Sequence, residues 1–386
     1  MKRPIAGRRP ASLIAVYVAV CVTLSAIAAS ADPRPAPTML QPATIQKAVR
    51  APDVQDAQQQ IAFAIGEQRS DWAAVDDVLA SPGLGDIERE FLLYGTLMRA
   101  RNVEADDAGI AFVSRLQSYE SKTFVRHEEG PLPVAVYPIA TLATGTLRFW
   151  NRRQVARDAS LAFAAGDMSR MQSLRQTGSD DYAGTLAALR AADATAMVQA
   201  KEWLASNSND NNSNDNDFYE ARAVVALATG DRTLAAELLI TDNGAASIQL
   251  LRATRQHFDA TTAFDLLQHA TSNPAIASAA LFELDALRHA GFDERIDSYL
   301  LDALAEPTLG ATAAAIIARR QDPALLARVA GVLSSPASSQ SQQARAALAL
   351  TLADTQYARS ALRDAVTSEH ITDSDLQKEL AEWLQN

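Results

Sequence analysis

A recurring break in helical patterning constrains the fold of this chain more than any other feature of its sequence. At each break a two-residue step ends in aspartate, and apolar residues resume at helical spacing behind it. The steps are Gly166-Asp167, Ala192-Asp193, Gly230-Asp231, Phe258-Asp259, Phe292-Asp293, Gln321-Asp322 and Ala353-Asp354. Aspartate favours helix starts because its carboxylate accepts the free N–H groups of the first turn. Each step therefore predicts a turn followed by a second helix.

The steps recur about every thirty residues, a period typical of stacked helical hairpins. Behind Asp231, for example, Leu234 and Leu238 return on one helix face. Good helix formers are prominent, and no stretch shows the two-residue alternation of a strand. The sequence therefore predicts an all-α fold of stacked antiparallel helical hairpins that form an α-solenoid, preceded by an irregular N-terminal helical part.

This pattern resembles the tetratricopeptide and HEAT-type helical-repeat families between residues 150 and 371. The stretch most similar to a tetratricopeptide unit runs from Tyr219 to Leu239 and contains, in order, Ala223, the turn Gly230-Asp231 and Ala235. The segment from Gln343 to Val366 is similar to a HEAT-type pair. The large aromatic and the Leu-Gly signature of the first tetratricopeptide helix are missing. The resemblance is therefore architectural and carries no functional residues, but it implies a surface that binds other proteins.

The first 31 residues have the three zones of an export signal. Basic residues come first, an apolar run from Leu13 to Ala28 follows, and Ala29-Ser30-Ala31 matches a cleavage site. The apolar run is short for a membrane-spanning helix. We therefore expect a cleaved signal peptide over 1–31 and a periplasmic protein. An inner-membrane protein anchored by an uncleaved signal is the alternative.

Behind the leader the sequence predicts a series of regions. They are a proline-rich spacer over 32–42, a helical region over 43–120, a long loop over 121–138, a helical-repeat region over 139–371 with a polar insertion at 207–217, and a C-terminal capping helix over 372–386. After cleavage no integral membrane segment is expected.

Charge and cysteine content limit the expected chemistry. The formal net charge of −11 disfavours nucleic acid, because an acidic surface repels phosphate backbones. The only cysteine, Cys21, lies in the leader, so the mature chain is predicted to have neither a disulfide nor a cysteine-based metal site. We expect no metal site and no cofactor.

The densest charged cluster lies within the 121–138 loop, at residues 126–131. His127, Glu128 and Glu129 are candidate catalytic residues, because an imidazole beside carboxylates suits acid–base chemistry. The H-E-x-x-H pattern of a zinc site is missing. The plainer interpretation is a solvated loop between helices.

Four aromatic residues flank that loop. Phe124, Tyr137, Phe149 and Trp150 are candidate binding residues that line a groove for a peptide or a glycan. Aromatic residues at such spacing are more often part of a core.

The leading hypothesis for function is an exported binding scaffold of the bacterial cell envelope, with a protein or peptide partner held on the α-solenoid surface. A second hypothesis is an enzyme that acts on envelope polysaccharide through the 126–131 loop. A third is a structural spacer of the envelope.

Overall fold

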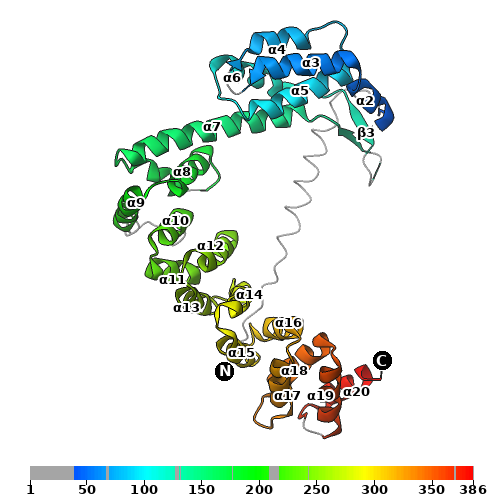
Figure 1. Cartoon of the computed structure of the whole chain (residues 1–386), viewed down its shortest axis with the longest axis vertical. Helices are drawn as coiled ribbons and strands as arrows, with labels where there is room; N and C mark the ends of the chain where they lie inside the picture. Colours follow the sequence, from blue (N-terminus) through cyan, green and yellow to red (C-terminus); the bar gives the residue numbers. More distant parts are fainter. Residues whose placement is uncertain are drawn as a thin grey trace, which may run out of the picture. The chain divides into compact units, whose positions relative to one another are not determined.

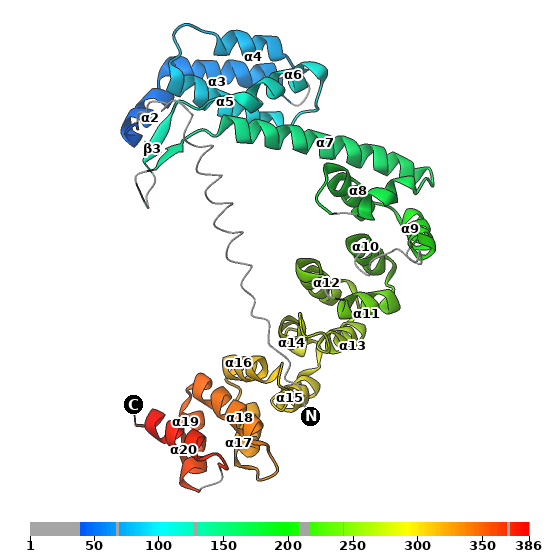
Figure 2. The ribbon, with the colours of Figure 1, turned by 180° about the vertical axis from the view of Figure 1, so that it is seen from behind.

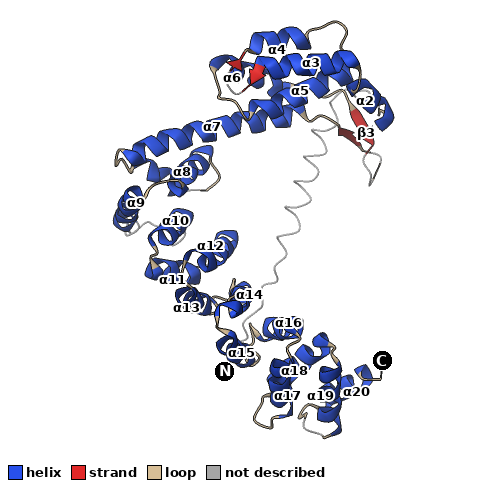
Figure 3. Ribbon diagram, in the orientation of Figure 1, coloured by secondary structure: helices blue, strands red, loops and turns tan. Residues whose placement is uncertain are grey.

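The computed structural model describes residues 39–66, 69–126, 130, 132–175, 177–207, 217–241, 243–368 and 371–385. Over these residues the fold is all-α, as predicted, with four short strands in two hairpins (Figure 3). The predicted signal peptide and most of the predicted proline-rich spacer lie outside the described residues.

The chain divides into two compact units, the first ending at Trp150 and the second beginning at Asn151. The first unit contains α2 Pro42–Val49, α3 Pro52–Ala64, β1 Ile65–Gly66, β2 Arg69–Ser70, α4 Trp72–Leu79, α5 Asp86–Ala100, α6 Asp107–Arg115, η2 Leu116–Ser118, β3 Phe124–Arg126 and β4 Pro133–Ala135 (Figure 1). Pro42 and Pro52 start helices, because proline lacks the N–H that a first helical position leaves unpaired. The division falls inside α7 Ile139–Ala164.

The core of the first unit is built around Trp72 at the start of α4. Its ring centroid lies 5.2 Å from that of Phe112 and 6.1 Å from that of Trp150. Gly109 on α6 permits this packing, because a Cβ atom there would meet the Trp72 indole at 2.7 Å. Helices α3, α4 and α5 contact one another around this core.

The second unit continues from α7 as a series of helices. They are η3 Ser169–Arg175, α8 Asp180–Arg190, α9 Ala194–Asn207, α10 Tyr219–Thr229, α11 Arg232–Ile240, α12 Gly244–His257, α13 Ala260–Ala270, α14 Ala277–Asp285, η4 Arg288–Ala290, α15 Asp293–Ala303, α16 Gly310–Arg320, α17 Pro323–Ser334, α18 Gln340–Ala353, α19 Gln356–Thr367 and α20 Ser374–Trp383. The predicted polar insertion joins α9 to α10, and residues 208–216 of it lie outside the described residues. The helix predicted at the C-terminus is α20, which contacts α19.

Helices of the second unit pack on their neighbours in sequence order. Helix α10 contacts α12, α12 contacts α14, α14 contacts α16, and α16 contacts α18. The alternate helices do the same where α11 meets α13, α15 meets α17 and α17 meets α19. In both views α10, α12 and α14 follow one another, with α11 and α13 beside them (Figures 1 and 2). A continuous apolar core runs through these layers from Tyr219 to Leu380.

Several polar contacts between helices of the second unit join residues about thirty apart in the sequence, and others join residues 23 or 41 apart. Arg190 and Glu220 are 30 residues apart and Arg328 and Ser298 are also 30 apart. Tyr219 donates its hydroxyl to Ser247, which lies 28 residues further on. These three contacts have about the same spacing as the aspartate steps.

Several predicted helix caps are confirmed. Asp193, Asp231, Asp259 and Asp322 each accept at least one backbone N–H of the turn that follows. At Asp231 the Lys201 ammonium, 2.7 Å away, is the first cause that holds the pKa of the carboxyl below its ordinary value. The N–H groups of Leu234 and Thr233 act in the same direction, because hydrogen bonds to the charged form favour it.

The other steps differ from the prediction. Asp293 is the first residue of α15 rather than its cap, and Phe292 precedes it in the cap position. Asp354 ends α18 in a left-handed conformation with φ of 47°, and the Thr355 hydroxyl caps α19 instead. Asp167 accepts the N–H of Ser169, but the segment behind it is the 3₁₀ helix η3. Pattern alone does not show whether an aspartate ends one helix or begins the next.

The turn glycine at Gly230 has a measurable conformational role. Its φ is 65°, and a Cβ there would meet no atom within 4 Å, so any penalty for alanine comes from the backbone alone. We expect Gly230→Ala to lower the free energy of unfolding by about 1 kcal/mol. Gly331, inside α17, is equally uncrowded and lacks a positive φ. Gly331→Ala should raise the free energy of unfolding by about 0.5–1 kcal/mol. Denaturant titration of both variants measures these changes, and equal signs would contradict the prediction.

Candidate functional site

The segment over 121–138 is not wholly the loop that the sequence predicts. Strand β3 pairs antiparallel with β4, with Phe124 opposite Ala135 and Arg126 opposite Pro133. Met39 bridges to Phe124 from the N-terminal side. Strands of three residues are too short to show alternation in the sequence. The candidate catalytic residues His127, Glu128 and Glu129 lie outside the described residues.

The four aromatic candidates have different surroundings. Phe124 is half-buried on β3. The ring of Tyr137 packs between Phe91 and Tyr94 of α5, with centroids 6.2 and 5.8 Å away.

The other two aromatic candidates lie next to each other on α7. Phe149 is exposed, whereas Trp150 is buried and its indole N–H donates to the carbonyl oxygen of Ala100 at 2.9 Å. Trp150 is therefore part of the core of the first unit and does not line a surface groove.

A buried carboxylate that sequence reasoning missed anchors the start of the 121–138 segment. Glu90 of α5 is fully buried. It accepts the backbone N–H of Lys122 at 2.5 Å and that of Thr123 at 3.1 Å. Glu90 lies on the apolar face of α5, three residues before Leu93, and that position is the signal that could have revealed it.

The pKa values of two tyrosines are affected by this carboxylate. Burial, followed by the negative charge of Glu90, raises the pKa of Tyr119 to about 12. The same two causes raise the pKa of Tyr137. Tyr119 also hydrogen-bonds to Glu90, so three donors converge on one carboxylate. The arrangement gives Glu90 a structural role as an anchor of the segment that begins at Lys122.

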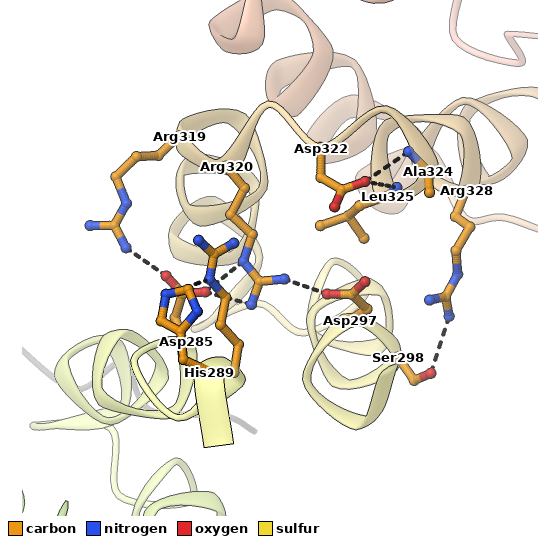
Figure 4. Close-up of polar contacts among 11 residues, drawn as sticks. Asp285, His289, Asp297, Ser298, Arg319, Arg320, Asp322, Ala324, Leu325 and Arg328 are labelled. Carbon is orange, nitrogen blue, oxygen red and sulfur yellow. Dashed lines mark hydrogen bonds and ion pairs between the residues drawn. The ribbon is translucent and has the colours of Figure 1, made fainter. Parts of the chain in front are cut away.

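An ion-pair network of the second unit joins the three successive helices α14, α15 and α16 (Figure 4). Asp285 of α14 accepts from Arg319 at 2.6 Å and from the Nε of Arg320 at 2.5 Å. Arg320 also pairs with Asp297 of α15. The side chain of Arg320 is only 5% exposed. The two carboxylates compensate the charge of the buried guanidinium, and its Nε and Nη1 both donate to them. The cluster therefore joins the three helices.

A second set of side chains lies along successive second helices of the hairpins. We name Arg232, Asp265, Arg295, Ser298 and Arg328 the charged row. Asp265 of α13 pairs with Arg232 of α11 at 3.3 Å and with Arg295 of α15 at 3.2 Å. Arg328 of α17 donates to the Ser298 hydroxyl at 3.1 Å. The row is largely exposed to solvent.

One arginine of the charged row, Arg295, also packs on an aromatic ring. The guanidinium of Arg295 lies 3.9 Å from the centroid of the Phe264 ring, which stacks on Phe292 at 5.2 Å. A cation over an aromatic face is stabilised by the ring quadrupole. Arg295 is thus held both by an ion pair and by an aromatic ring.

The described part of the chain also bears on metal binding and on membrane crossing. Within it, no group of three or more histidine, cysteine, aspartate or glutamate side chains is placed to hold a metal ion. No helix in these ranges combines the length and the apolar character needed to cross a membrane. Comparison with protein-family models, with characterised proteins and with solved structures finds no match to this chain.

Proposed function

We propose that this chain is an exported protein of the bacterial cell envelope that acts as a binding scaffold. In this proposal the helical hairpins of the second unit form an α-solenoid similar to tetratricopeptide and HEAT-type repeats. A protein or peptide partner binds the surface that successive second helices build, with the charged row as its polar part.

The observation that carries the proposal is the spacing of contacts between layers. Several polar pairs join residues 28 to 34 apart, such as Arg255 with Glu283 and Ser278 with Thr312. In repeat proteins each unit contacts only its neighbours, and side chains from successive units form one extended binding surface. The regular spacing supports such an assembly.

The rigidity of the charged row supports a role in recognition. Side chains that are already ordered lose less conformational entropy when a partner binds. Arg295 is held by Asp265 and by the Phe264 ring. Export is supported by the first 31 residues, whose basic start, apolar run and Ala29-Ser30-Ala31 site are typical of a cleaved signal. The proposed location is the periplasm.

Site-specific photo-crosslinking in living cells tests this function. A photoreactive residue is placed at Arg232 or at Arg328 of the charged row, and in a matched control at Ile110, which is an exposed residue of α6. The envelope fraction is purified after irradiation and crosslinked partners are identified by mass spectrometry. We expect one dominant partner from both charged-row positions and none from Ile110.

The same experiment reports on location. The purified chain should begin after residue 31 and appear in the periplasmic fraction. Recovery from the cytoplasm with the leader intact would overturn the export proposal. A chain that is exported but yields no charged-row crosslink would overturn the scaffold proposal alone.

A further inference from the structure

The α3–α4 hairpin of the first unit carries an open groove on its surface. Two adjoining cavities form it, of about 370 and 590 Å³. Both are lined by Gln60, Asp77 and Val78, which makes the groove continuous. Along α3 it runs from Asp53 to Phe63, about 15 Å at about 1.5 Å per residue.

The groove combines an apolar floor with an exposed aromatic side chain. Ala57, Val78 and Leu84 line the first cavity, and Ala64 and Ala74 line the second. Phe63 borders the second cavity with 73% of its surface exposed. A large apolar side chain beside a concave surface is typical of an interaction site.

The charge of the groove is negative. Asp53 and Asp77 both line it. The neighbouring Asp76 forms an ion pair with the guanidinium of Arg115 at 2.7 Å. Among the described residues neither Asp53 nor Asp77 has an ion pair. A cationic partner therefore meets two available carboxylates at one edge of an apolar surface.

We propose that this groove is a docking site for a basic amphipathic helix of a partner protein. Such a helix places apolar residues at helical spacing against Phe63 and the alanine floor, and directs lysine or arginine toward Asp53 and Asp77. A partner helix of about three turns is long enough to span the groove. The net charge of −11 disfavours a second copy of this acidic chain as the occupant. The inference rests on the proposed function, because it assumes a protein partner.

Fluorescence anisotropy with purified full chain tests the groove. The probe is a labelled synthetic helix of about fourteen residues, with leucine on one face and lysine on the other. A second peptide has glutamate in place of every lysine. We expect the lysine peptide to bind with a Kd below about 100 μM. Its binding should weaken as the salt concentration increases. The glutamate peptide should bind at least about tenfold more weakly.

Four variants locate the binding. Phe63→Ser and Asp77→Lys should each raise the Kd of the lysine peptide about tenfold or more. Ile110→Ser and Asp302→Lys change exposed residues outside the groove and should leave the Kd unchanged. Equal binding of both peptides, or equal losses in all four variants, would overturn the proposal. Self-association that Phe63→Ser abolishes would do the same by identifying a second copy as the occupant.

The groove proposal and the scaffold proposal can be rejected independently of each other. A scaffold partner crosslinked at the charged row but indifferent to Phe63→Ser and Asp77→Lys would remove the groove proposal only. Peptide binding in the groove without any crosslink at the charged row would remove the scaffold proposal and keep the groove.

Discussion

Arg320→Met is expected to lower the free energy of unfolding by about 3 to 5 kcal/mol. The variant removes a guanidinium that is only 5% exposed and leaves Asp285 and Asp297 in place. Methionine fills a similar volume, so the loss comes from the uncompensated carboxylates rather than from a cavity. Among the described residues Asp285 then retains the ion pair with Arg319, and Asp297 loses its guanidinium.

The neighbouring arginine is the matched control for Arg320. Arg319 binds the same Asp285 at 2.6 Å, but its side chain is 61% exposed. Exposed ion pairs contribute little because solvent screens them. Arg319→Met should therefore cost less than about 1 kcal/mol. Denaturant titration gives both values, and comparable losses would show that burial does not determine the strength of this network.

Hydrogen exchange shows where the Arg320 effect is located. Peptides from α14, α15 and α16 should exchange faster in Arg320→Met, because the network joins these helices. Peptides from α5 and α6, in the first unit, should be unchanged. The double variant Asp285→Asn with Arg320→Met should lose less than the sum of the two single changes, because each single change strands a charge. Additive losses would mean that the two side chains do not act as a pair.

Much of the helical order could be predicted from the sequence because helix starts have local causes. The carboxylates of Asp231, Asp259 and Asp322 cap the helices directly behind them, and a cap depends on residues within one turn. Asp354 shows the limit of this reasoning. Its left-handed conformation ends α18 one residue before the cap of α19, and aspartate suits both positions.

The polar networks could not be predicted, because their partners come from different hairpins. Arg320 and Asp285 are 35 residues apart, and nothing local to either residue identifies the other. Once the spacing of about thirty is known, ion pairs between residues about that far apart can be expected. The spacing does not show which residues form them. The α3–α4 groove was missed for a related reason. Phe63 lies off the apolar stripe of Val54, Ala57 and Ile61, so helical spacing places it on the outer face of α3. Only the packing of α3 against α4 shows the concave surface beside it.

Glu90→Leu is expected to lower the free energy of unfolding by about 2 to 4 kcal/mol. Leucine fills a similar space but leaves the buried N–H of Thr123 and the part-buried N–H of Lys122 without an acceptor. Each unsatisfied buried donor costs about 1 to 3 kcal/mol, and some relief comes from local movement of the segment. Because that segment leads into β3, the β3–β4 hairpin should lose protection first.

Thr96→Val is the matched control on the same helix. Thr96 is also buried, but its hydroxyl donates only to the Leu92 carbonyl one turn back, at 2.8 Å. That carbonyl belongs to the helix ladder, so an isosteric valine strands no donor, and the expected loss is under about 1 kcal/mol. Hydrogen exchange at Lys122 and Thr123 should accelerate in Glu90→Leu and stay slow in Thr96→Val.

The tyrosines near Glu90 provide a readout that a loss of packing alone would not give. The negative charge of Glu90 raises the pKa of Tyr119 and of Tyr137 in addition to the effect of burial. Removing that charge lowers both pKa values toward their ordinary value, so tyrosine ionisation begins at lower pH in Glu90→Leu. Ultraviolet titration of the folded variant measures this shift, with Thr96→Val as the reference. An unchanged tyrosine titration curve would mean that Glu90 does not act on these hydroxyls as a charged carboxylate, and the anchor would then have to be reassigned to packing.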